Sequence, residues 1–153
     1  MRFALAIFNS WVIKLTTTPA LSSIEQIQEA ADCFFAISDA LHRRLVAGGF
    51  DEGHLNPSIE VYGILTDEYG LRARASILRN DANFHVVENA SKEQKTLLSA
   101  LKKATLALEQ INNIRELRSI VVSISTLCVA ISPGKGEVVD FLLSQLQSDL
   151  SNF

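Results

Sequence analysis

A lysine between two glycines is the part of the sequence that most resembles a chemical site. Pro133, Gly134, Lys135 and Gly136 follow an apolar run and precede a segment with apolar residues at helical spacing. Free backbone N–H groups at the start of a helix attract anions, and Lys135 would add a positive charge. These residue types could therefore bind phosphate or a nucleotide.

The established phosphate-binding patterns do not fit this turn. A Walker A loop with Gly134 and Lys135 as its GK pair needs glycine at position 129 and Ser or Thr at 136, where Val129 and Gly136 stand. A dinucleotide-binding pattern that begins at Gly134 needs glycine at 139, where Val139 stands. Proline and glycine are also the residues that a turn between two elements requires. We therefore favour a turn and keep anion binding by Gly134, Lys135 and Gly136 as the alternative.

The other reactive side chains form no recognisable catalytic or metal-binding pattern. Asp51, Glu52 and His54 are close in sequence, but no second ligand cluster and no HExxH motif accompanies them, so a solvated loop is favoured over a metal site. Cys33 and Cys128 lie in apolar segments, where thiols tend to be inert, and they form no CxxC pair. We expect no catalytic residue, no metal and no cofactor, and two free thiols in a reducing compartment, the cytoplasm.

Composition narrows the classes of partner. The chain has 153 residues, of which 48% are hydrophobic and 20% charged, which predicts a single globular domain over 1–153. A formal net charge of −3 argues against a general nucleic-acid binder, which needs a basic surface. The longest apolar run, 120–131, is too short to span a membrane. The apolar start of the chain resembles a signal peptide, but polar residues interrupt it, so we expect it to belong to the fold; residues 3–15 fit strand or helix equally well.

Two long amphipathic helices and a C-terminal helix are predicted from apolar periodicity. Ser22 with Glu25, and Ser91 with Gln94, have the spacing of a capping box at a helix start. The first helix should end at Gly48. The expected buried faces are Ile24, Ile27, Ala31, Phe34, Ser38, Leu41 and Leu45 in the first helix, Leu97, Leu101, Ala104, Leu108 and Ile111 in the second, and Val139, Leu143, Leu146 and Leu150 in the last.

A small antiparallel sheet is predicted between and after the long helices. Alternating apolar residues indicate a hairpin over 58–79, with its loop at 66–70, and further strands are expected near 83–88 and 119–131. The predicted fold class is therefore α+β, with the sheet packed against two long amphipathic helices and a C-terminal helix.

The outer face of this hairpin is the predicted partner-binding surface. It would carry Tyr62, Ile64, Arg72 and Arg74. Tyrosine and arginine are the residue types that anchor protein interfaces, and an exposed isoleucine beside them favours a covering partner.

These features favour a non-catalytic protein–protein interaction module, which resembles small acidic bacterial chaperones, immunity proteins and adaptors. The expected order of elements is similar in outline to that of type III secretion chaperones. The partner would be a protein, with a homodimer as a further option, and neither nucleic acid nor a membrane. The alternative is a small enzyme or a nucleotide- or anion-binding domain that uses the turn Pro133–Gly136.

Overall fold

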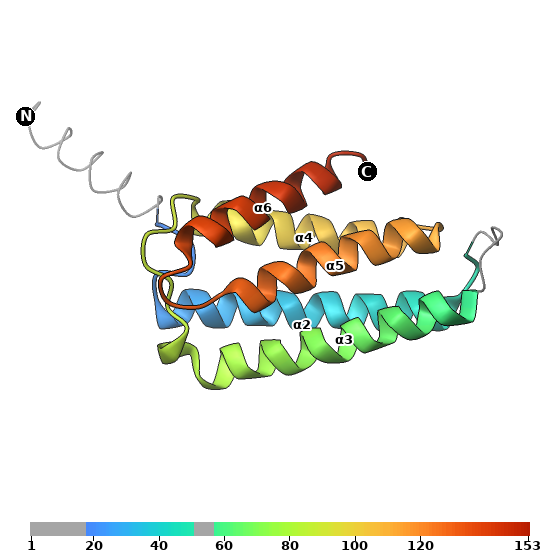
Figure 1. Cartoon of the computed structure of the whole chain (residues 1–153), viewed down its shortest axis with the longest axis horizontal. Helices are drawn as coiled ribbons and strands as arrows, with labels where there is room; N and C mark the ends of the chain where they lie inside the picture. Colours follow the sequence, from blue (N-terminus) through green and yellow to red (C-terminus); the bar gives the residue numbers. More distant parts are fainter. Residues whose placement is uncertain (1–17, 51–56) are drawn as a thin grey trace, which may run out of the picture.

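The chain folds as an antiparallel bundle of helices (Figure 1). The computed structural model describes residues 18–50 and 57–153. Each helix runs opposite to the one before it along the long axis of the molecule (Figure 1). The elements are α2 (Ile24–Ala47), α3 (Pro57–Asn80), the short 3₁₀ helix η1 (Ala82–Phe84), α4 (Gln94–Gln110), α5 (Ile114–Ala130) and α6 (Gly136–Leu150).

The predicted hairpin over 58–79 is wrong, because this segment is the single helix α3. Its buried positions follow helical spacing of three and four residues, not the alternation of a strand: Ile64, Glu68, Leu71, Ala75 and Leu78. Glu68 occupies a position where a helical pattern would be expected to show an apolar residue. Glu68 therefore interrupts the helical spacing of apolar residues in the sequence, whereas the alternating apolar residues are uninterrupted and favour a strand.

The strands predicted near 119–131 and 83–88 are wrong as well, so the α+β class is replaced by an all-helical one within the described residues. The first of these segments belongs to α5. Its Val and Ile residues favour strands, but burial of a helical face in the bundle overrides that weak preference. The second begins in η1 and continues as a loop. Without a sheet, the likeness in outline to type III secretion chaperones is lost.

The predicted helices are confirmed, although two of them begin later than expected. The buried faces predicted for α4 and α6 are fully or almost fully buried. In α2 the prediction is wrong at its two ends, because Ile24 is 43% exposed and Leu45 is only partly buried. α2 begins one residue late, with Ser23 as its N-cap, and ends before Gly48, which has a positive φ of 65°. α4 begins at Gln94 itself, so Ser91 is not its cap. Asn113 caps α5 by accepting hydrogen bonds from the N–H groups of Arg115 and Glu116.

The helices enclose one continuous apolar core. α2 packs against both α3 and α4, α5 packs against α3 and α6, and α6 also contacts α4. The largest buried side chains come from all of the first four helices, and include Phe34, Ile64, Leu101 and Ile124. The outer face of each helix is therefore what remains available for other molecules.

The segment before α2 is held against the loop before α4 by hydrogen bonds. The N–H groups of Ala20 and Gln94 donate to the carbonyls of Lys92 and Thr18 at 2.8 and 2.9 Å. The buried Gln94 side chain accepts from the N–H of Leu21 at 3.0 Å and donates to the carbonyl of Gln26 at 3.1 Å. These bonds fix the starts of α2 and α4 relative to each other.

None of the helices in the described residues is long and apolar enough to cross a membrane.

Candidate functional site

The four residues of the predicted binding surface lie on different sides of α3. Tyr62 points outward and is 75% exposed, whereas Ile64 is fully buried in the core. In a helix, successive residues rotate by about 100°, so residues that would share one face of a strand are separated. Only Tyr62 of the four is free to meet a partner with its whole side chain.

Arg72 is part of an ion-pair network between α2 and α3. Its guanidinium group donates to Asp39 of α2 at 2.9 Å and to Glu68 of α3 at 3.1 Å. The carboxylate of Glu68 is almost fully buried, and its second oxygen lies 3.3 Å from Nδ1 of His42. Arg72 therefore supplies a partner for a buried charge, which is a structural role.

Arg74 binds the end of α5. Its guanidinium group donates to the carbonyl of Ile131 at 2.8 Å and, at 3.5 Å, to the carbonyls of Cys128 and Val129. The last carbonyls of a helix have no partner within the helix and carry partial negative charge, so an arginine stabilises them. Arg74 thus joins α3 to α5.

The turn Pro133–Gly136 has a structural explanation for both of its glycines. Gly134 has a φ of +75°, which favours glycine. Gly136 is buried at the start of α6, and a Cβ atom there would lie 2.6 Å from the carbonyl oxygen of Glu88. The Lys135 side chain is exposed. The anion-binding alternative stays a prediction, because these roles need no ligand and do not test one.

Asp140 fixes α6 to the loop before α4. Its carboxylate accepts hydrogen bonds from the N–H and hydroxyl groups of Ser91, both at 2.8 Å, and from the N–H of Lys92 at 3.0 Å. Burial raises the pKa of Asp140, but these hydrogen bonds outweigh it and hold the pKa below its ordinary value of 3.8. The ionised carboxylate is thus part of the fold.

We expect Asp140→Asn to lower the free energy of unfolding at pH 7 by about 1 kcal/mol, because an amide is a weaker acceptor than a carboxylate. Because folding lowers the pKa of Asp140, its contribution is complete above pH 3.8 and is lost as the pH falls through the folded-state pKa. The difference between wild type and Asp140→Asn in urea unfolding should therefore shrink below about pH 4. A difference that is constant from pH 7 to pH 3 would show that the charge of Asp140 contributes nothing.

The outer face of α3 carries an uncharged stripe that the strand interpretation concealed. Nine residues of α3 from Ile59 onward are exposed, and Arg79, which forms an ion pair with Asp32, is the one charged member. On α4, by contrast, Lys95, Lys102, Lys103 and Glu109 are exposed. The eight uncharged residues, called here the α3 stripe, are Ile59, Tyr62, Thr66, Tyr69, Gly70, Ala73, Ile77 and Asn80.

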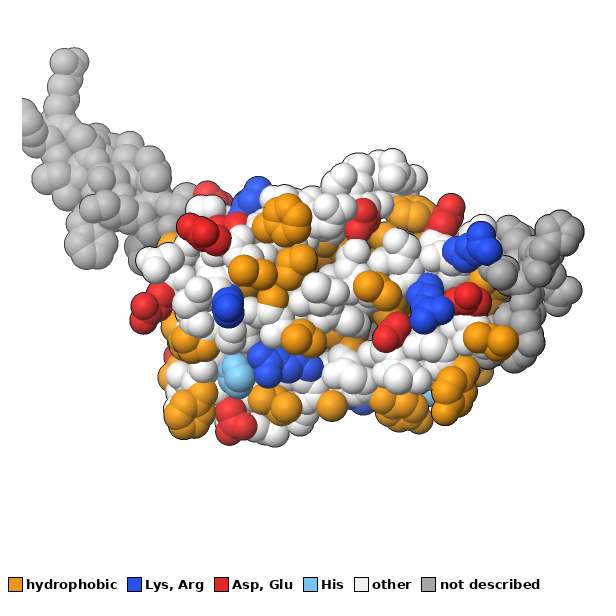
Figure 2. Space-filling model, viewed as in Figure 1, with side chains coloured by type: hydrophobic (Ala, Val, Ile, Leu, Met, Phe, Trp, Pro, Cys, Tyr) orange, Lys and Arg blue, Asp and Glu red, His pale blue; other side chains and the backbone are white. Residues whose placement is uncertain are grey.

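The α3 stripe is apolar and aromatic over most of its length. Tyr62, Tyr69 and Ile59 are 75%, 71% and 66% exposed. Figure 2 shows hydrophobic side chains spaced along the lower edge of the molecule, over α3. The spacing of three and four residues is that of a helix surface that packs against another helix. A helical reading of 59–80 would have found this stripe in the sequence.

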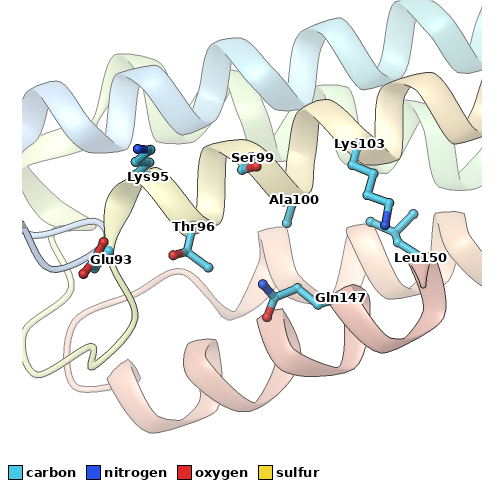
Figure 3. Close-up of a pocket in the computed structure, with 8 residues that line it drawn as sticks. All are labelled: Glu93, Lys95, Thr96, Ser99, Ala100, Lys103, Gln147 and Leu150. Carbon is cyan, nitrogen blue, oxygen red and sulfur yellow. The ribbon is translucent and has the colours of Figure 1, made fainter.

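A polar groove of about 480 Å³ lies between α4 and α6 (Figure 3). Thr96 and Ala100 of α4 and Gln147 of α6 point into it, while Glu93 and Lys103 stand toward its two ends (Figure 3). Charged side chains do not converge on one point, so the groove does not assemble an acid–base pair or a nucleophile with its base.

The thiols and acidic groups of the described residues likewise assemble no reactive centre. Burial raises the pKa of the Cys128 thiol to about 12 and also raises that of Cys33, which disfavours the reactive thiolate. Over 18–50 and 57–153, no three His, Cys, Asp or Glu side chains gather as a metal site would require. The sequence cluster of Asp51, Glu52 and His54, and the ambiguous segment 3–15, lie outside the described residues.

Comparisons of the chain with protein-family models, curated proteins and solved structures give no match.

Proposed function

We propose that this chain is a non-catalytic protein-interaction module that binds a protein through the α3 stripe. The observation that carries the proposal is the uncharged exposed face of a helix of 24 residues, with two tyrosines more than 70% exposed. An outward helix face in a globular protein is ordinarily charged or polar, whereas the centres of protein interfaces are poor in charge and enriched in aromatic residues such as tyrosine. Burial of Tyr62, Tyr69 and Ile59 against a partner would remove this apolar surface from water.

The chemistry of the stripe favours a protein partner over the other classes. Nucleic acid would need a basic surface, and the chain has a net charge of −3 and an uncharged stripe. Spacing of three and four residues fits an apolar partner helix laid along α3. We place the protein in the cytoplasm on the basis of its two free cysteines.

The test is capture of partners from an extract of the native host with three tagged proteins: wild type, a Tyr62→Glu/Tyr69→Glu variant and a Phe141→Glu variant. Phe141 is a matched control, because it is 68% exposed but lies on α6. A carboxylate buried in an apolar interface is strongly unfavourable, so wild type and Phe141→Glu should retain a partner that the tyrosine variant loses. Equal capture by all three proteins would contradict the proposal.

A further inference from the structure

We infer that the partner of the α3 stripe is a second copy of this chain, with the two α3 helices packed antiparallel about a two-fold axis between Tyr69 and Gly70. This inference rests on the proposed function, since it names the occupant of the same surface. It is carried by the order of residues along the stripe and by the sizes of their side chains.

The stripe is complementary to itself when it is reversed. A two-fold axis between Tyr69 and Gly70 places each residue of one copy opposite a residue of the other copy. The numbers of the two facing residues add up to 139. All eight members of the stripe then face another member: Ile59 with Asn80, Tyr62 with Ile77, Thr66 with Ala73, and Tyr69 with Gly70. A two-fold interface requires this reciprocity, because the same patch is used by both subunits.

The side-chain sizes also match in this register. The large ring of Tyr69 lies over Gly70 of the other copy, and Thr66 lies over the small Ala73. A Cβ atom built on Gly70 would meet nothing within 4 Å in the monomer, so open space is available beside it for the ring. Small residues at the centre allow two helices to approach closely, while parallel packing would set each tyrosine against itself and leave Gly70 facing Gly70.

The helix dipoles favour the antiparallel direction. Two antiparallel helices set opposite dipole ends beside each other, whereas parallel helices set like ends together. The charged side chains of α3 do not decide the direction, because they are engaged within one copy. Glu68 is buried beside Arg72, Arg74 binds the carbonyl of Ile131, and Arg79 pairs with Asp32.

The expected dimer is weak. A helix of 24 residues is about 36 Å long and about 10 Å wide, so a contact along it buries roughly 400 Å² on each copy. This is below the area of a standard stable interface and fits a transient one. Sedimentation equilibrium of the full chain, from about 1 μM to about 1 mM, should show a reversible monomer–dimer equilibrium.

Two single-cysteine variants test the register. Thr66→Cys and Ala73→Cys, carrying tags of different size, are mixed at high concentration and oxidised. In the inferred register these positions face each other, so the mixture should give a heterodimer linked by a disulfide. Either variant alone should not, because its two copies would be displaced by seven residues, about 10 Å along the axis, which is beyond disulfide reach. Wild type oxidised in the same way controls for Cys33 and Cys128.

A parallel dimer would show the reverse pattern, with each variant linking to itself, and would overturn the inference. A Tyr69→Glu variant should raise the dissociation constant by about tenfold or more, with circular dichroism confirming that it is folded. A chain that stays monomeric to about 1 mM and forms no 66–73 link would also overturn it. If the tyrosine variant then still loses a host protein that wild type captures, the proposed function stands with a different partner; if it does not, both are wrong.

Discussion

Arg44→Ala should lower the free energy of unfolding by about 3 kcal/mol, because Arg44 joins the ends of three helices from a buried position. Arg44 is 8% exposed near the end of α2. Its guanidinium group donates to the carbonyl of Ile111 at 3.0 Å, just after α4, and to Oδ1 of Asn112 at 3.1 Å, just before α5. It also donates to the carbonyl of Gly48 and lies 4.0 Å from the ring centroid of Phe50.

The loss of stability arises because the substitution leaves carbonyl groups without their hydrogen-bond donor. The carbonyls of Ile111 and Gly48 follow helix ends, where the backbone dipoles concentrate negative charge, so they lose a charged donor in a poorly solvated place. A hydrogen bond to a charged group is worth about 1.5–3 kcal/mol, and the stacking on Phe50 is lost too. Arg44→Lys should recover little of the lost stability, because an ammonium group cannot reproduce the planar guanidinium group that donates to three acceptors.

Arg43→Ala is the matched control. Arg43 is the preceding residue of α2, but its side chain is 66% exposed and lies 3.6 Å from the half-exposed carboxylate of Glu109. Exposed ion pairs contribute little, so urea unfolding should show a loss below about 0.5 kcal/mol. Similar losses for the two variants would mean that Arg44 acts only as a surface charge.

The helices whose buried faces are mainly apolar could be predicted from the sequence. In α4, Leu97, Leu101, Ala104 and Leu108 repeat at three or four residues, and the structure buries them all. Each of these positions holds an apolar residue that is buried in the core. The periodicity of the sequence therefore matches the packing of the helix in the bundle. The same agreement holds for α6. It holds for most of α2, where Ile27, Ala31, Phe34 and Leu41 are buried as predicted but Ile24 is 43% exposed.

α3 could not be assigned in this way, because a charge interrupts its buried face in the middle of the helix, whereas the buried Arg44 of α2 lies in the last turn. Glu68 is buried only because Arg72 and His42 lie beside it, and His42 belongs to a different helix. A partner that comes from another helix cannot be recognised from a local sequence pattern. The alternating apolar residues Ile59, Val61 and Leu65 can be recognised, and they indicate a strand. The error affected the predicted binding surface too: Tyr62 is exposed as predicted, but Ile64, which the strand pattern placed on the same face, is buried.

The roles of the arginines and of Gly136 depend on contacts between distant segments. Arg74 was predicted to face a partner, yet it binds the carbonyl of Ile131, 57 positions away in sequence. Turn chemistry predicted Gly134 and Gly136 equally, but Gly136 is required by the backbone of another loop. Sequence could indicate that a turn occurs at this place, and only the packed bundle shows which glycine a neighbouring backbone constrains.

Gly136→Ala should lower the free energy of unfolding by about 2 kcal/mol, although alanine is ordinarily the better helix former. The added Cβ would lie 2.6 Å from the carbonyl oxygen of Glu88, 2.6 Å from the carbonyl carbon of Asn89 and 2.7 Å from the nitrogen of Ala90. These are backbone atoms, so a side-chain rotation cannot relieve the overlap. Asn89 already has a positive φ of 64°, and the loop has to move as a whole.

Gly70→Ala is the control with the opposite expected sign. Gly70 also lies in a helix, but a Cβ there would meet nothing within 4 Å. At concentrations where the chain is monomeric, thermal unfolding should therefore show a gain of about 0.5–1 kcal/mol from the reduced backbone entropy of the unfolded state. If Gly136→Ala also stabilised the protein, the close contact between α6 and the loop 88–90 would be absent.

The two substitutions at the start of α6 should not be additive. The loop that Gly136→Ala displaces leads directly into Ser91 and Lys92, whose N–H groups donate to Asp140. Once that loop has moved, these hydrogen bonds are weakened, so Asp140→Asn should cost less in the Gly136→Ala background than in wild type. A double-mutant cycle measured by urea unfolding at pH 7 should show a coupling of at least about 0.5 kcal/mol. Strict additivity would mean that the glycine contact and the carboxylate act on separate parts of the loop.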